Sequence, residues 1–103
     1  MIKHIVLFQL KGELSPEQRQ SVMDEFKKGI DALPAIIPEI KSISVNFNCN
    51  PSEAWHICLE STFDTIEDLE TYANHPDHKA VGAALRPNMA ARSCVDYSFW
   101  NFA

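Results

Sequence analysis

The spacing of hydrophobic residues changes several times along this chain, and the order of these changes is the feature that most limits its fold. A spacing of two residues is typical of strands, and a spacing of three and four is typical of amphipathic helices. Strand spacing covers residues 2–10, 40–47, 55–63 and about 93–102. Helical spacing covers residues 16–33 and 66–85. The predicted order β, α, β, β, α, β is the ferredoxin-like arrangement, an α+β fold with a four-stranded antiparallel sheet, in one domain over residues 1–103.

The predicted helices begin at recognisable capping sequences. Ser15 is a candidate N-cap, with Pro16 at the first helical position and Gln18 at the capping-box position. Thr65 starts the second helical region, and Pro76 restarts it after a short break. The capping signals and the hydrophobic spacing therefore place the helices in the same parts of the chain.

One face of the predicted sheet is left without a helical cover. Two helices can cover only one face of a four-stranded sheet, so apolar residues on the other face need a second partner. These residues run from Ile5 and Leu7 to Trp55 and Ile57. An exposed apolar face usually marks an interface, and face-to-face pairing buries it in both copies. We therefore expect a homodimer through this sheet face, a dimeric α+β barrel.

The composition argues against several classes of partner. Nine Lys and Arg residues against fourteen Asp and Glu residues give a net charge of −5, which disfavours nucleic acid and anionic membranes. The apolar run at residues 5–8 is too short for a signal peptide or a membrane span. Three cysteines without C-x-x-C spacing favour a reducing compartment, with Cys58 and Cys94 as buried thiols in strands. We therefore expect a cytoplasmic location.

Residues 74–78, with the sequence NHPDH, carry the clearest functional signal. They place His75 and His78 around a proline at a predicted helix start. Histidine is the side chain whose ordinary pKa lies close to neutral pH, so this concentration of imidazoles favours a functional site. The other two histidines, His4 and His56, lie within apolar strand patterns. If the fold brings the strands to the helix start, the imidazoles form one site.

Four segments together resemble the stress-responsive A/B barrel domain (Dabb) family. They are residues 2–8 (IKHIVLF), 56–60 (HICLE), 69–78 (LETYANHPDH) and 95–97 (VDY). The resemblance spans nearly the whole chain and depends most on the histidine of the first strand and the H-P-x-H sequence. It implies a small dimeric α+β barrel. One plant branch of the family, that of olivetolic acid cyclase, closes a linear polyketide by an aldol-type condensation without metal or cofactor.

The resemblance to that branch implies roles for individual residues. His78 corresponds by position to the catalytic histidine, and a neutral imidazole can act as a general base. Tyr72 corresponds to a phenol that donates to a developing oxyanion, and Asp96 to a carboxylate that orients His78. His4 and His56 would line the same cavity between sheet and helices. The apolar walls of that cavity would be Val6, Phe8, Val22, Met23, Phe26 and Cys58.

Each polar candidate also has a purely structural interpretation. His78 at a helix start can simply contact the backbone, and His4 in an apolar strand is more often a hydrogen-bonded core residue. His75 precedes a proline and suits a helix start. Tyr72 has core spacing, and Asp96 can be a solvated strand residue. No metal site is expected at His75 and His78, because their spacing is not a zinc pattern and no third ligand lies nearby.

Three classes of function fit these observations. The first is a dimeric module that binds a small apolar or aromatic molecule in a cavity beside His78. The second is a cofactor-independent cyclase or a lyase with His78 as general base, although Val22, Met23 and Phe26 replace side chains of the cyclase branch. The third is a stress-response protein whose function is the dimer itself, or a quinol monooxygenase-like enzyme. One fold hosts many functions, so the resemblance does not choose among them.

Overall fold

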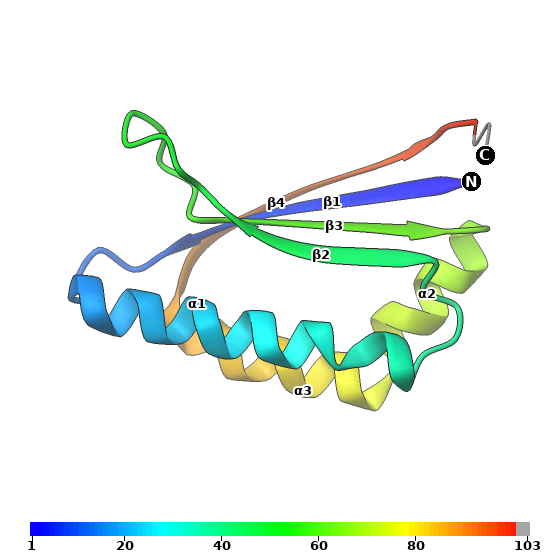
Figure 1. Ribbon diagram of the computed structural model, residues 1–103, viewed down its shortest axis with the longest axis horizontal. Coiled ribbons are helices and arrows are strands. Elements are labelled where there is room, and N and C mark those ends of the chain that lie inside the picture. Colours follow the sequence, from blue (N-terminus) through cyan, green and yellow to red (C-terminus); the bar gives the residue numbers. More distant parts are fainter. Residues whose placement is uncertain (101–103) are drawn as a thin grey trace.

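The computed structural model describes residues 1–100, which form a four-stranded antiparallel sheet and three α-helices (Figure 1). The strands are β1 (Ile2–Leu10), β2 (Ser42–Phe47), β3 (Ile57–Phe63) and β4 (Met89–Ser98). The helices are α1 (Pro16–Asp31), α2 (Ile66–Asn74) and α3 (Pro76–Leu85), with 3-10 turns at Leu33–Ala35 and Arg86–Asn88. The strand order β2-β3-β1-β4 confirms the predicted ferredoxin-like fold. Within the described residues no helix is long and apolar enough to cross a membrane.

The helix starts form at the predicted capping residues. The Ser15 hydroxyl accepts a hydrogen bond from the Gln18 amide at 3.1 Å, and the Gln18 side chain accepts one from the Ser15 amide at 2.9 Å. The Thr65 hydroxyl accepts from the Asp68 amide at 3.1 Å and caps α2 in the same way. These bonds satisfy backbone donors that have no partner inside the helix, and so they fix where each helix begins.

The hydrophobic core lies between the sheet and the helical layer. Figure 1 shows α1 and α3 side by side along one face of the sheet, with α2 at one end. Val6 and Leu10 of β1 are buried against this layer, as are Phe26 and Ile30 of α1. The alternation of β1 therefore runs as predicted, with its even-numbered residues toward the helices.

The expected position of Ile57 on the uncovered face is wrong. Ile57 pairs with Phe8 and Phe47, is only 1% exposed and belongs to the core. Its neighbour Cys58 pairs with Leu7 and Asn46, so the Cys58 side chain lies on the other face. Because side chains alternate along a strand, residues 57 and 58 cannot both line the helical side. Cys58 is therefore not a wall of a cavity under the helices.

Strand β4 begins at Met89, four residues before the position expected from sequence. Met89 and Ala91 pair with Leu10 and Gln9, so the ladder extends farther than the apolar pattern of β4 indicates. The predicted strand end at residue 102 lies outside the described residues.

β4 is an edge strand, and the side chain of Cys94 on it is exposed rather than buried as expected. Edge strands receive less cover from the helices, which explains the exposed thiol.

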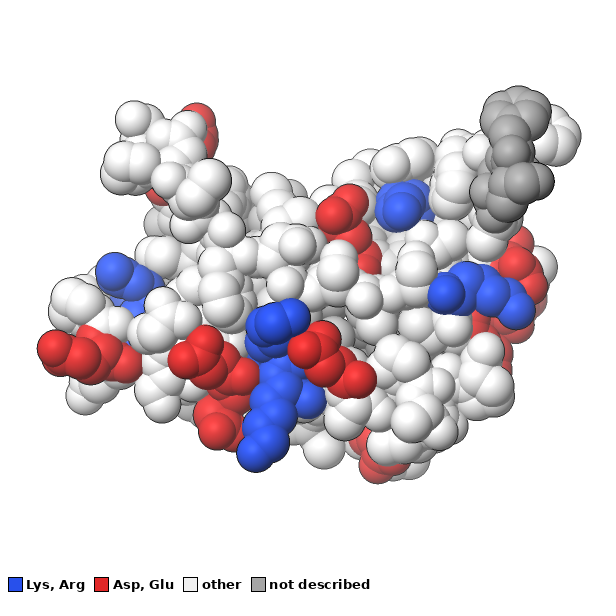
Figure 2. Space-filling view, viewed as in Figure 1, with Lys and Arg blue, Asp and Glu red and all other residues white. Residues whose placement is uncertain are grey.

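The sheet face opposite the helices, which we call the open face, carries an apolar strip along β1 and β4. Ile5 pairs with Val95, and Leu7 and Tyr97 extend the same side of the sheet. Val95 and Tyr97 are 54% and 47% exposed in the isolated chain. Figure 2 shows the surface hollowed above the sheet, between the β2–β3 loop and the end of β4, with few charged side chains along it.

Candidate functional site

His78 lies in the first turn of α3, where local sequence fixes both the backbone and the ring. Pro76 is the first residue of α3, and His75 before it is extended and caps the helix by accepting from the Asp77 amide at 3.1 Å. The structural role expected for His75 is therefore confirmed. The Nδ1 atom of His78 lies 3.0 Å from the carbonyl oxygen of Ala73 at the end of α2. A carbonyl can only accept, so Nδ1 carries the proton and Nε2 is left as the acceptor of the neutral ring.

The surroundings of His78 favour its neutral form. Burial lowers the pKa of His78, and positive charge on His4, Arg92 or His75 lowers it further. The hydrogen bond to Ala73 acts in the opposite direction but does not outweigh burial. A neutral imidazole with a free nitrogen is the state that a general base requires near neutral pH.

Tyr72 packs directly against His78 and is completely buried. Its ring centroid lies 4.3 Å from that of His78 and 5.1 Å from that of Phe63, and the ring of His4 lies 6.4 Å away. The Tyr72 hydroxyl has no hydrogen-bond partner among the described residues. Burial raises the pKa of Tyr72 above its ordinary range, so the phenol remains protonated and able to donate. A buried hydroxyl without a hydrogen-bond partner costs stability and needs an explanation. One explanation is that the hydroxyl bonds to a bound molecule.

Asp96 contacts His4 rather than His78. Strands β1 and β4 pair these two residues directly, and Oδ1 of Asp96 meets Nδ1 of His4. The expectation that Asp96 orients His78 is therefore wrong, because the Ala73 carbonyl occupies that nitrogen. His4, Tyr72, His78 and Asp96 still lie in one group, and His4 is close enough to His78 for its positive charge to lower the pKa of His78. We call this group the imidazole cluster.

Ser61 is a polar residue of this region that sequence reasoning missed. It pairs with His4 across the sheet, is 1% exposed, and its hydroxyl has no hydrogen-bond partner among the described residues. The available signal was a serine on the strand face that otherwise holds Ile57, Leu59 and Phe63.

The position of Cys94 was also missed. The apolar pattern of its strand indicated a buried thiol, whereas its thiol lies beside His4.

His56 does not join the imidazole cluster. Its Nδ1 accepts a hydrogen bond from the Leu10 amide at 3.0 Å, at the opposite end of β1 from His4. Burial lowers the pKa of His56, and the charge of Arg19 adds to this effect. The expected shared cavity for His4 and His56 is therefore wrong, because His56 contacts β1 at Leu10, six positions along an extended strand from His4.

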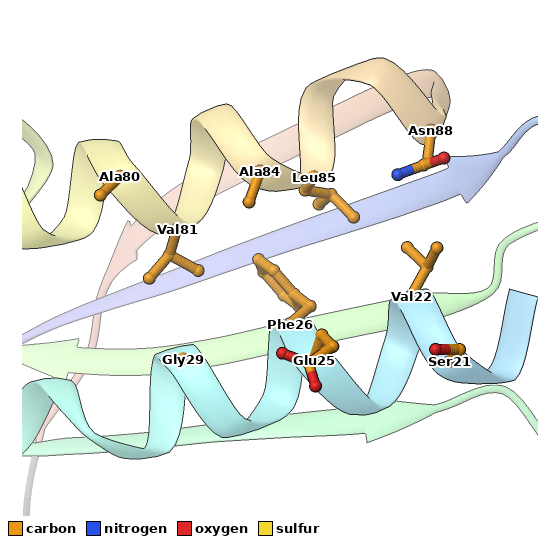
Figure 3. A pocket seen from close by; sticks show the side chains of 10 residues that line it. All are labelled: Ser21, Val22, Glu25, Phe26, Gly29, Ala80, Val81, Ala84, Leu85 and Asn88. Atoms are coloured by element: carbon orange, nitrogen blue, oxygen red, sulfur yellow. The ribbon is translucent and has the colours of Figure 1, made fainter.

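A cavity of about 510 Å³ lies between α1 and α3, and we call it the α1–α3 groove (Figure 3). Figure 3 shows Val22 and Phe26 of α1 facing Val81 and Leu85 of α3 across it. The other lining residues are Ser21, Glu25, Gly29, Ala80, Ala84 and Asn88. The groove is thus mainly apolar, with a few polar groups at its margins.

The α1–α3 groove contains only part of the predicted cavity wall. Val22 and Phe26 line it, whereas Val6, Phe8 and Met23 are core residues that do not. His78 is not a lining residue either, although Val81 of the groove lies one helical turn beyond it on α3. The expected cavity bounded by all six apolar residues is therefore wrong, because the core fills the space nearest the sheet.

A second cavity of about 260 Å³ lies between the β2–β3 loop and the sheet. Leu7 and Cys58 contribute to it from the strands, and Asn48, Glu53 and Trp55 from the loop region. Leu7 and Cys58 face away from the helices, whereas Phe47 and Ile57, which also line the cavity, pack with the core, so the cavity lies beside the loop and is not confined to the open face. It is separate from the imidazole cluster.

Comparison with known proteins gives a consistent picture. The family model described as "Stress responsive A/B Barrel Domain" matches residues 2–99. A dimeric protein of unknown function and ferredoxin-like fold from Bacteroides fragilis is 47% identical, with 95% of each chain covered and a TM-score of 0.93. A dimeric ferredoxin-like protein from Thermobifida fusca is 27% identical, with 95% of this chain and 90% of that chain covered and a TM-score of 0.79. Olivetolic acid cyclase from Cannabis sativa is 27% identical over 100 residues, covering 94% of this chain and 95% of its own.

Proposed function

This chain belongs to the stress-responsive A/B barrel domain (Dabb) family, and we propose that it acts as a homodimer that binds a small apolar or aromatic molecule. The observation that carries the proposal is the α1–α3 groove, whose volume of about 510 Å³ falls in the range of small-molecule sites. The dimeric state of similar proteins supports the assembly, and the apolar strip of the open face supplies a surface for it. Three free cysteines support a cytoplasmic location.

The lining of the groove favours a neutral ligand. Its walls are aliphatic and aromatic, and the one ionisable group among its lining residues is the carboxylate of Glu25. An anion would be repelled by this carboxylate and by the net charge of −5. Ser21 and Asn88 can hydrogen-bond to a hydroxyl or carbonyl of an otherwise apolar molecule.

A binding titration with 1-naphthol, an uncharged aromatic probe, tests the groove. Ala84 lines the groove, so Ala84→Trp fills it and should abolish probe binding while the unfolding transition persists. Ala83 is an exposed neighbour on α3 that does not line the groove, and Ala83→Trp should bind the probe as the wild type does. Equal binding by both variants would exclude the groove as the site.

The second candidate function is proton transfer beside a carbonyl, as in a cyclase or a lyase. It is favoured by the orphaned Tyr72 hydroxyl next to a His78 ring whose Nε2 is free to accept a proton. His78 would remove the proton and the Tyr72 phenol would donate to the oxyanion that forms. The similarity to a protein named olivetolic acid cyclase agrees with chemistry of this type.

Deuterium exchange into butyrophenone, an aromatic ketone, measures such proton transfer by NMR without a known substrate. The wild-type protein should accelerate exchange at the carbon beside the carbonyl, and His78→Ala should remove the acceleration. His75→Asn replaces the neighbouring imidazole with a residue that also caps helices and should retain it. Acceleration that survives in His78→Ala would exclude His78 as the base.

A further inference from the structure

Three side chains of the kind that bind transition metals converge between β1 and β4. Sγ of Cys94 lies 3.6 Å from Nδ1 of His4 and 3.8 Å from Oδ1 of Asp96. Nδ1 of His4 also contacts Oδ1 of Asp96, and the three candidate ligand atoms all lie within 4.8 Å of one another. We propose that His4, Cys94 and Asp96 form a binding site for one divalent transition-metal ion, and that Zn²⁺ fits it best.

The pairing of the two strands holds this set together. Asp96 is the direct partner of His4 in the β1–β4 ladder. Cys94 lies two residues earlier on β4 and so projects from the same face as Asp96. The hydrogen-bonded ladder fixes the relative positions of ligands on paired strands. Little of the chain therefore has to become ordered when an ion binds. The sequence gives no spacing signal for the site, because His4 and Cys94 lie 90 positions apart.

The separation of His4 from Cys94 matches a tetrahedral zinc centre. Zinc lies about 2.0–2.1 Å from a histidine nitrogen and about 2.3 Å from a thiolate, which places these two ligands about 3.5 Å apart at the tetrahedral angle. The distance from Nδ1 of His4 to Sγ of Cys94, 3.6 Å, agrees with this value. The direct contact of His4 with Asp96 is too short for two ligands of one ion, so it must open, and the Asp96 side chain is 36% exposed. The ion would replace that contact.

The ligand types favour zinc over other common ions. A set of one imidazole, one thiol and one carboxylate suits a borderline cation, whereas Mg²⁺ and Ca²⁺ prefer oxygen ligands alone. The thiolate and the carboxylate together neutralise the two charges of the ion, and the thiol proton of Cys94 passes to solvent on binding. Three protein ligands leave a fourth position for water or a small molecule. Cys94 and Asp96 are exposed, so an ion reaches the site from solvent.

The proposed metal site does not depend on the proposed ligand or on proton transfer by His78. Its test is direct binding of the metal alone, and failure of naphthol binding or ketone exchange would leave that result unchanged. The proposed ligands do not include His75 and His78, the pair considered as metal ligands from the sequence. His75 caps α3, and the Nδ1 atom of His78 bonds to the Ala73 carbonyl.

Titration of the metal-free chain with Co²⁺, in a buffer with a non-thiol reductant, tests the proposal. We expect one equivalent to bind with a thiolate-to-metal absorption band, and Zn²⁺ to displace it. Cys94→Ser should remove the band and weaken Zn²⁺ binding, measured against a chromophoric chelator, by at least about tenfold. Asp96→Asn should weaken Zn²⁺ binding while the thiolate band is retained. Cys49→Ser, which changes an exposed thiol in the β2–β3 loop, should behave as the wild type does.

The proposal is overturned if the wild type shows no thiolate band, or if the band persists in Cys94→Ser. Loss of the band in Cys49→Ser would also overturn it, because the thiol would then come from another part of the chain. Circular dichroism of each variant distinguishes loss of a ligand from loss of the fold. Since Cys94 and Asp96 are both exposed, two variants test the site without disturbing the core.

Discussion

The imidazole of His78 packs against the phenol of Tyr72 with ring centroids 4.3 Å apart, while the Tyr72 hydroxyl has no hydrogen-bond partner among the described residues. A buried hydroxyl without a partner costs stability, whereas the ring itself contributes to the core. Stability and the proposed proton transfer therefore place opposite demands on this side chain. The buried hydroxyl of Ser61 beside His4 carries the same cost to stability.

Tyr72→Phe separates these two demands. Removing only the orphaned hydroxyl should raise the free energy of unfolding by about 1 kcal/mol, because a desolvated polar group is lost and the ring is kept. Ketone exchange should fall by about a hundredfold if the phenol donates to the oxyanion. Urea unfolding and NMR exchange measure the two effects. A destabilised Tyr72→Phe would mean that the hydroxyl is satisfied in the folded protein.

His78 should make the stability of the protein depend on pH. Burial lowers the pKa of His78 below its unfolded value, so the unfolded chain takes up a proton first as the pH falls. This contribution to stability is complete above the unfolded pKa and is lost progressively as the pH falls below it. His78→Gln removes the linkage, so its loss of Tm between about pH 7.5 and about pH 5.5 should be smaller than that of the wild type. If Tm fell by the same amount in both proteins over this pH range, the lowered pKa of His78 would be contradicted.

Much of the fold could be predicted from local patterns. The alternation of β1, the capping box at Ser15 and the break at Pro76 each follow from residues close together in the chain, and each is present. The early start of β4 could not be predicted in this way. Its first residues are held by pairing with β1, and that pairing leaves little pattern in β4 itself.

The candidate site was less accessible to sequence reasoning than the fold. The grouping of His4, Tyr72, His78 and Asp96 followed from the family resemblance and is present as a cluster. The partner of Asp96 could not be predicted, because a helix-end carbonyl takes Nδ1 of His78 and strand pairing gives Asp96 to His4. The groove lies between α1 and α3 because Phe8 and Met23 fill the core beneath the helices, and sequence does not distinguish a core wall from a cavity wall.

The proposed dimer interface can be tested with a charge on the open face. Val95→Asp places a carboxylate in the apolar strip, and twofold symmetry would bury two such charges in one interface. Sedimentation velocity should show dimers for the wild type and monomers for Val95→Asp. Ile66 on α2 is similarly exposed at 43% but does not belong to the open face, so Ile66→Asp should remain dimeric. A monomeric wild type, or a dimeric Val95→Asp, would exclude this interface.

The close contact of α1 with α3 beside the groove depends on Gly29. A Cβ atom at this position would lie 3.0 Å from Cγ2 of Val81, which is tighter than ordinary van der Waals contact. Glycine inside a helix costs about 0.5–1 kcal/mol relative to alanine, so its presence here opposes helix propensity and is explained by this contact.

A double-mutant cycle of Gly29 and Val81 measures the contact. In a Val81→Ala background, Gly29→Ala should stabilise the protein by about 0.5–1 kcal/mol, because the helix gains propensity without a clash. With Val81 present, steric strain should cancel or reverse that gain, because the new methyl group must displace the valine. Urea unfolding of the four proteins gives the coupling energy. The same gain in both backgrounds would show that α1 and α3 can separate freely, and that neither Gly29 nor Val81 sets the width of the groove.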